Sequence, residues 1–75
     1  MIPLPLIEKG KSVKIQKISG GRGFSLRLMD MGIKEGDVVK IINNSQGSLL
    51  ISLENIRLVL GRDAAFRIFV KYAKE

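Results

Sequence analysis

The segment Val38–Leu60, VVKIINNSQGSLLISLENIRLVL, contains three runs of strand-forming residues separated by two turns. Val38–Ile42 is apolar on both faces except at Lys40, which predicts a buried, central strand. The polar run Asn43–Gly47 and the pair Glu54–Asn55 have the composition of turns. After each turn, apolar residues occupy alternate positions: Leu49, Ile51 and Leu53, then Ile56, Leu58 and Leu60. The segment therefore predicts a three-stranded meander.

Another strand is predicted on the N-terminal side of the meander. Val13 and Ile15 alternate with Lys14 and Gln16, which places the apolar pair inward and the polar pair in water. Ile18 breaks this alternation just before the glycines at positions 20, 21 and 23. A break of this kind predicts a bulge or a sharp bend.

The C-terminal side predicts a last strand after one helical turn. Asp63 is a candidate cap for that turn, and one face of the strand carries Ile68, Val70 and Tyr72. About five short strands with glycine-marked bends predict an all-β fold, a small closed barrel with one short helix, because closure removes exposed sheet edges. We expect residues 1–75 to form one domain, since so short a chain cannot supply two cores.

The short helix is predicted from Phe24 to Met31, with Gly32 as its C-terminal stop. At about 100° per residue, one side of this helix carries Phe24, Leu28 and Met31. Leu26 and Met29 lie on the other side. These two residues either pack into the same small core or stay exposed, and an exposed apolar patch marks a surface for a partner or for self-association.

Composition excludes several classes of protein. The 75 residues carry a net charge of +6 and include neither cysteine nor histidine, which excludes disulfide scaffolds and thiolate metal sites. Met1–Ile7 holds two prolines and has no basic n-region, so we do not expect a signal peptide. Apolar runs of the roughly 20 residues needed for a membrane span are absent from the sequence. We expect a cytoplasmic protein.

Catalytic and metal-binding chemistry is poorly represented. Histidine and cysteine, the residues most used in catalysis near neutral pH, are missing, so we expect a protein that is not an enzyme and needs no cofactor. Asp30, Glu35 and Asp37 flank the turn after the helix and offer oxygen ligands for a hard cation. Because a calcium or magnesium site needs more ligands at defined spacing, we interpret them as a helix end and a solvated turn.

The positive charge raises the possibility of a small basic barrel that binds nucleic acid, and this is the alternative function. Such barrels combine a basic face with stacking aromatic residues. Here the aromatic residues are few, and the pattern assigns Phe24 and Tyr72 to the core. The basic residues extend from Lys9 to Lys74 without concentrating in one stripe. This distribution favours a solvated cationic surface over a nucleic-acid site.

One further run resembles a known family. Arg27–Ile41, RLMDMGIKEGDVVKI, is similar to the signature RL-x-x-LG-[IL]-x-x-G-x-x-V-x-[VI] of the FeoA family, small cytoplasmic proteins associated with bacterial ferrous iron transport. Met31 stands where leucine is usual, a conservative exchange. The similarity extends to other apolar and glycine positions: Leu6, Gly10, Val13, Ile15, Gly20, Gly21, Leu60, Ala65, Ile68 and Val70. The resemblance implies an SH3-like barrel.

The resemblance also implies a role and a partner. It points to an accessory protein that is not an enzyme and that binds the membrane ferrous iron transporter FeoB on its cytoplasmic side. As contact residues we predict Leu26, Arg27 and Met29 on the helix, with Arg22 in the glycine bend as a flanking charge. Self-association remains open, since an apolar surface serves a second copy equally well.

The same barrel also resembles the C-terminal domain of iron-dependent repressors of the diphtheria toxin repressor type. That resemblance opens a second interpretation, the binding of a peptide segment in a groove. The scarcity of aromatic residues argues against a proline-rich peptide. The lack of the repressors' DNA-binding helices argues against direct transcriptional control.

Overall fold

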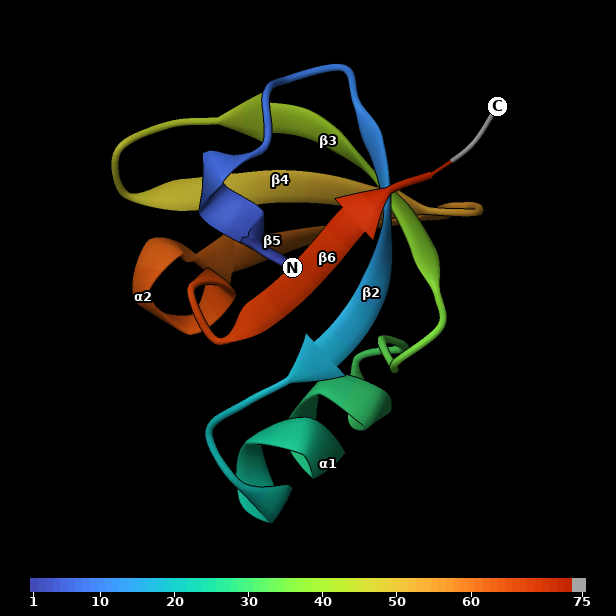
Figure 1. Cartoon of the computed structure of the whole chain (residues 1–75), viewed down its shortest axis with the longest axis vertical. Helices are drawn as coiled ribbons and strands as arrows, with labels where there is room; N and C mark the ends of the chain where they lie inside the picture. Colours follow the sequence, from blue (N-terminus) through green and yellow to red (C-terminus); the bar gives the residue numbers. More distant parts are fainter. Residues whose placement is uncertain (74–75) are drawn as a thin grey trace.

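The computed structural model describes residues 1–73, which form six strands, two α-helices and one short 3₁₀ helix (Figure 1). In chain order the elements are β1 (Ile2–Pro3), η1 (Leu4–Leu6), β2 (Ser12–Ile18), α1 (Arg22–Asp30), β3 (Val38–Asn44), β4 (Ser48–Leu53), β5 (Ile56–Gly61), α2 (Arg62–Ala65) and β6 (Ile68–Tyr72). Within this range, no helix has the length and apolar character required to cross a membrane.

The strands form one antiparallel sheet in the order β1-β6-β2-β3-β4-β5. The predicted meander is confirmed, because β4 pairs with β3 on one side and with β5 on the other. The last strand, β6, returns to lie between β2 and the two-residue strand β1. The sheet curls into an SH3-like barrel, as predicted, with α1 beyond one end of it (Figure 1).

Helical turns pack beside the two terminal strands of the sheet. β1 and β5 are the terminal strands of the sheet and are not paired with each other. Instead α2 contacts β4, β5 and η1, and η1 contacts β6. The helical turns η1 and α2 therefore fill the opening between β1 and β5. Backbone hydrogen bonds join all neighbouring strands of the sheet.

A hydrogen-bonded cluster fastens η1 to the meander, and we call it the Asn44–Arg62 clasp. Asn44 Nδ2 donates to the carbonyl oxygens of Pro5, at 2.9 Å, and Ile7, at 3.0 Å. Arg62 Nη1 donates to Asn44 Oδ1 at 2.7 Å and to the Ser45 carbonyl at 2.9 Å. The clasp thus joins three segments that are far apart in the sequence: the 3₁₀ helix, the β3–β4 turn and α2.

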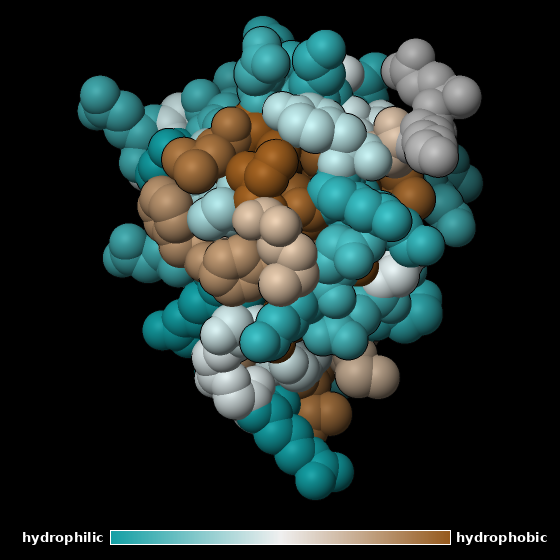
Figure 2. Space-filling model, in the orientation of Figure 1, coloured by the Kyte–Doolittle hydropathy of each residue, from teal (hydrophilic) through white to brown (hydrophobic). Residues whose placement is uncertain are grey.

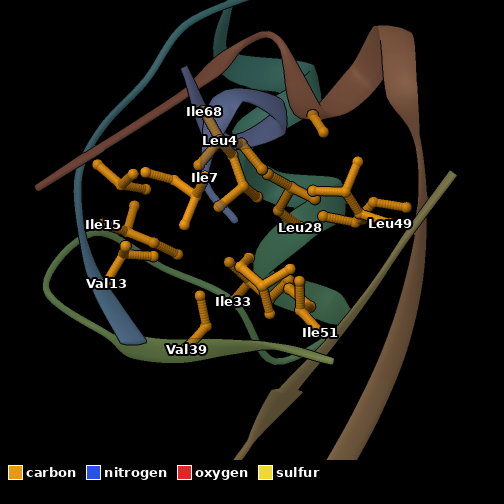
Figure 3. Packing of buried hydrophobic residues seen from close by; sticks show 14 residues of the cluster. Leu4, Ile7, Val13, Ile15, Leu28, Ile33, Val39, Leu49, Ile51 and Ile68 are labelled. Atoms are coloured by element: carbon orange, nitrogen blue, oxygen red, sulfur yellow. The ribbon is translucent and has the colours of Figure 1, made fainter. Parts of the chain in front are cut away.

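The core fills the inside of the barrel (Figure 3). It contains one side chain from each helical element, the inward positions of β2 to β6, and one residue from each of the loops after η1 and α1: Leu4, Ile7, Val13, Ile15, Leu28, Ile33, Val39, Ile41, Leu49, Ile51, Leu60, Ala65, Ile68 and Val70. The side chains of Leu4, Leu28 and Leu49 converge from different elements in Figure 3. Burial at alternate strand positions confirms the period of two.

Three details of the prediction are wrong. Val38 is 49% exposed, so β3 is buried on one face only, because a curled single sheet has only one inner face. Tyr72 is 47% exposed, since β6 runs past the core after Val70. Asp63 does not cap α2: Gly61 is the N-cap, no side chain caps the helix, and Asp63 lies within the first turn.

The predicted irregularity in the second strand is confirmed. The register of β2 against β6 shifts between Ile15 and Lys17, which is the signature of a β-bulge. The extra residue explains why Ile18 falls out of the alternation. The glycine bend that follows then leads directly into α1.

Candidate partner-binding surface

The C-terminal end of α1 is held by a Schellman motif. Gly32, at φ +95°, donates its N–H to the Met29 carbonyl at 2.9 Å, and Ile33 donates to the Leu28 carbonyl at 2.9 Å. Only glycine adopts this left-handed conformation without strain. The motif also brings Leu28 and Ile33 together, and both side chains are buried in the core. The rotation of α1 about its axis is therefore fixed by these two anchors.

With that rotation fixed, the opposite side of α1 faces solvent. Leu26 is 48% exposed and Met29 is 55% exposed, whereas Leu28 is only 2% exposed. Phe24 and Met31 are half-buried and pack against the core, as the helical period predicts. Of the two possibilities that the sequence left open, the structure shows the second: Leu26 and Met29 stay outside the core.

The predicted contact residues do not all lie together. At about 100° per residue, Arg22, Leu26 and Met29 fall on one exposed face of α1, spaced at four and three residues. Arg27 is also exposed, but it lies roughly 200° around the axis from Met29. The structure thus groups three of the four predicted residues and places Arg27 on a separate flank.

Met29 lies between two shallow hollows, which together we call the Met29 groove. The larger, of about 380 Å³, is open to solvent and is lined by Ile18, Ser25, Met29, Lys34 and Glu35. The smaller, of about 150 Å³, is lined by Met29, Gly32, Ile33 and Lys34. Because the Met29 side chain borders both hollows, it is the central apolar residue of this surface.

Hydrogen bonds to β2 hold the loop that forms one wall of the groove. Glu35 Oε2 accepts a hydrogen bond of 3.0 Å from the Ile18 N–H at the end of β2. Gly36 donates to the Ile15 carbonyl at 2.8 Å, and Ile15 donates to the Asp37 carbonyl at 2.8 Å. The groove is therefore built between a pinned helix and a pinned loop.

Asp37 closes that loop through Lys34. Its Oδ2 accepts from the Lys34 N–H at 2.9 Å, and its Oδ1 lies 2.9 Å from Lys34 Nζ. Burial acts to raise the pKa of Asp37, but the hydrogen bonds from Lys34 and its charge outweigh burial and hold the pKa below its ordinary value. Asp37 thus has a structural role in the turn.

The three carboxylates that flank the turn do not converge. Glu35 bonds the end of β2 and Asp37 bonds Lys34, so the two point to different partners. Across residues 1–73, the structure contains no group of three or more Asp or Glu side chains arranged to hold a metal ion.

In the larger hollow of the groove, sequence reasoning missed four residues, namely Ile18, Ser25, Lys34 and Glu35. One of them left a signal, since Ser25 precedes Met29 by four residues and so shares its helix face. Ile18 and Glu35 reach the groove through the β2 bulge and a hydrogen bond that spans 17 residues. Local periodicity carries no information about contacts of that range.

Comparisons with known proteins agree with the fold and identify the family. The family model of the FeoA domain matches residues 2–72. The chain is 36% identical over 74 residues to "Putative Fe(2+) transport protein A" of Methanocaldococcus jannaschii, covering 99% of this chain and 90% of that protein.

Solved structures give the same result. The crystal structure of an iron uptake regulatory protein (FeoA) has a TM-score of 0.86 at 26% identity and covers 96% of both chains. A manganese-dependent transcriptional repressor has a TM-score of 0.84 at 20% identity, over 95% of this chain and 41% of its own, and shows the fold alone. With a domain match over nearly its whole length and a relative of 36% identity, the chain belongs to the FeoA family.

Proposed function

We propose that this protein is a cytoplasmic accessory protein of ferrous iron uptake that has no enzymatic activity and binds the transporter FeoB through the exposed face of α1. The observation that carries the proposal is the two-faced helix, in which Leu26 and Met29 face solvent while Leu28 anchors the core. Membership of the FeoA family supplies the iron-transport context.

Physical chemistry supports an interface at this face. Flexible, polarizable methionine side chains adapt to a partner's surface, and Met29 already separates two hollows that an apolar side chain of FeoB can fill. The helix and the loop are pinned to the sheet, so little ordering entropy is lost on binding. The partner side chain that enters the Met29 groove is expected to dominate the affinity.

Two arginines of α1 accompany its exposed apolar face. Arg22 lies on the same face as Leu26 and Met29, one to two helical turns before them. Arg27 lies on the other flank of α1. It contacts FeoB only if the interface extends around the helix to that flank. Rim cations of this kind steer an acidic partner surface and affect the association rate more than the final affinity.

The deciding experiment is a pull-down of FeoB with the purified chain and with Met29→Asp, at low and high salt. A carboxylate at the centre of an apolar interface is expected to weaken binding at least about 30-fold, because loss of a central contact costs about 2 kcal/mol or more. Met29 is more than half exposed, so the variant is expected to keep its circular dichroism spectrum and melting temperature.

Leu6→Asp provides the matched control. Leu6, like Met29, is an exposed apolar residue, 60% accessible, but it lies on η1, away from α1. The front face of the molecule carries an apolar patch over the η1 region (Figure 2), so this variant also tests a competing surface. Equal loss of FeoB binding in the two variants, or loss only in Leu6→Asp, contradicts the assignment to α1.

The salt series separates the proposal from nucleic-acid binding. An apolar interface keeps most of its affinity at high salt, whereas contacts to phosphates weaken steeply because the release of counterions becomes less favourable as the salt concentration rises. Capture of a mixed single-stranded nucleic acid pool but not of FeoB, with the nucleic acid lost at high salt, would replace the proposed function with the alternative one.

A further inference from the structure

The outer side of β2 and β6 gathers lysines that are far apart in the sequence. In the β2–β6 register, Lys14 lies directly opposite Lys71, and Lys17 lies opposite Phe69. Phe69 and Lys71 point outward, because Val70 between them is buried in the core and neighbouring side chains on a strand point to opposite sides. Opposed side chains share one side of a sheet. Lys14, Lys17 and Lys71 therefore lie together on the outside of the barrel, and all three are exposed.

The positive charge of these lysines is not neutralised by the strands. Within residues 1–73, the six strands contain no carboxylate side chain. The one salt bridge found in this range joins Lys34 to Asp37, in the loop before β3. Like charges at directly opposed positions destabilise a sheet, since their β-carbons lie only about 5 Å apart. The opposed pair Lys14 and Lys71 therefore carries a repulsion that contact with an anionic surface relieves.

Exposed apolar side chains border the lysines on the other side of β6. There β6 pairs with β1, and Pro3 lies opposite Phe69. Met1, which precedes β1, is 73% exposed, and Leu6, on the η1 turn that contacts β6, is 60% exposed. Figure 2 shows the apolar patch over η1 with hydrophilic surface beside it. We call this mixed surface the β6 face and define it by Met1, Leu6, Lys14, Lys17 and Lys71.

We propose that the β6 face binds an anionic lipid surface. The three lysines then contact the headgroups, while Met1 and Leu6 enter the boundary between headgroups and acyl chains. Exposed apolar side chains next to cations are the combination that holds a protein on such a surface, because apolar burial and electrostatic attraction add together. This inference goes beyond the proposed function and does not depend on it.

The chemistry of the β6 face favours lipid over nucleic acid. Single-stranded nucleic acids are held by bases that stack on exposed aromatic rings. The most exposed apolar side chains of this face, Met1 and Leu6, have no ring, and Phe69 is half-buried. Its cations are lysines, which act as point charges and lack the planar fork with which arginine binds a phosphate in two places.

The charge of the β6 face disfavours a second copy of the chain as the partner. In a two-fold dimer the same patch of both copies forms the interface. Two patches that each carry Lys14, Lys17 and Lys71 would bring like charges together, and such contacts suppress association. A surface of opposite charge therefore suits this face better than its own copy.

The test is co-sedimentation of the full chain with lipid vesicles at low and high salt. One set of vesicles is pure phosphatidylcholine, and the other contains phosphatidylcholine and phosphatidylglycerol in equal parts. We expect binding to the mixed vesicles and a clear weakening at high salt, because salt screens exposed charges. Equal binding to both kinds of vesicle, or binding to neither, overturns the proposal.

Lys71→Glu and Arg57→Glu form a matched pair for the electrostatic part. Both reverse one exposed cation on a strand and change the net charge equally, but Arg57 lies on β5, at the other end of the strand order from β1. Lys71→Glu is expected to weaken vesicle binding roughly fivefold or more, since a lysine near an anionic surface contributes about 1 kcal/mol. Equal weakening by both variants would show attraction by net charge alone and contradict the assignment to the β6 face.

The fold is expected to survive this change. Lys71→Glu places a carboxylate opposite Lys14, so an opposed pair of like charges becomes a pair of opposite charges. The variant is therefore expected to melt at or above the temperature of the wild type while it binds vesicles less well. Circular dichroism checks this stability.

Leu6→Asp and Val59→Asp form the matched pair for the apolar part. The two residues are similarly exposed, at 60% and 64%, but Val59 lies on β5, outside the β6 face. Leu6→Asp is expected to weaken vesicle binding roughly tenfold, the equivalent of about 1.4 kcal/mol for an apolar side chain that is only partly buried in lipid. An unchanged affinity in Leu6→Asp, or the same loss in Val59→Asp, refutes the insertion of this patch.

Two further measurements address the other partners. A single-stranded oligonucleotide is added at a phosphate concentration equal to that of the phosphatidylglycerol, and sedimentation equilibrium gives the oligomeric state without lipid. If the oligonucleotide removes the chain from the vesicles, or if the chain forms a dimer that Leu6→Asp dissociates, the assignment to lipid is wrong. The vesicles contain no transporter, so failure here is distinct from failure to bind solubilised FeoB.

Discussion

Replacing Asn44 with alanine is expected to lower the free energy of unfolding by about 2–3 kcal/mol. Asn44 makes two neutral hydrogen bonds, to the carbonyls of Pro5 and Ile7, and one to the charged guanidinium of Arg62. Neutral bonds contribute about 0.5–1.5 kcal/mol each and charged ones about 1.5–3 kcal/mol. The low end of each range applies, because Asn44 is only half-buried and Arg62 keeps its bond to the Ser45 carbonyl.

The assay is reversible urea or thermal unfolding followed by circular dichroism. In a domain of this size, each 1 kcal/mol changes the melting temperature by about 4–8 °C, so Asn44→Ala is expected to melt at least about 8 °C below the wild type. The control is Asn43→Ala, which removes a neighbouring, exposed asparagine whose side chain reaches only the Asn44 N–H. We expect the control to remain within about 0.5 kcal/mol of the wild type.

Asn44→Asp separates the two halves of the clasp. The aspartate keeps an acceptor for Arg62 but loses the two donors, and it turns a negative oxygen toward the carbonyls of Pro5 and Ile7. This variant is therefore expected to be destabilised although its contact with Arg62 gains charge. If both Asn44 variants unfold at the same urea concentration as Asn43→Ala, the clasp does not stabilise the barrel and the reasoning fails.

Two more predictions concern the turns. Gly20→Ala is expected to lower the free energy of unfolding by about 1–3 kcal/mol, because Gly20 has φ +102° and a β-carbon there would lie 2.8 Å from Arg67 Cδ. The control in the same urea unfolding assay is Gly47→Ala, since a β-carbon at Gly47 meets open space. For Asp37, the folded pKa lies below its ordinary value of 3.8, so its contribution is present above that value and is lost as the pH falls through the folded pKa. As the pH falls from 6 to 2, Asp37→Asn is therefore expected to lose less unfolding free energy than the wild type. The difference between the two losses is expected to be about 1 kcal/mol or less, because Lys34 is well exposed. Equal losses of stability over this pH range, measured by urea unfolding, would contradict this role of Asp37.

Patterns within one element were predictable from the sequence. The alternation of Leu49 and Ile51 gives the inward face of β4, since neighbouring side chains on a strand point to opposite sides. Gly32 marks the end of α1, because only a residue tolerant of positive φ continues from that helix into the loop. In these places one local physical rule decides the structure.

Relations between distant elements were not predictable in this way. The Asn44 amide meets Pro5 and Arg62 only after the barrel has formed, and nothing near Asn44 in the sequence indicates either partner. Tyr72 follows the apolar period of its strand yet stands outside the core, because the end of the core is set by how far the other strands extend. The same limit concealed the pairing of Lys14 with Lys71.

The order of the strands also bears on how the chain folds. Each strand pair of the β3–β4–β5 meander is closed by a short loop, whereas β1 meets β6 only when nearly the whole chain has been brought back on itself. Closing so long a loop costs roughly 2–3 kcal/mol more entropy than closing a hairpin. We therefore expect the meander to form first and the sheet to be completed last, where β1 joins β6.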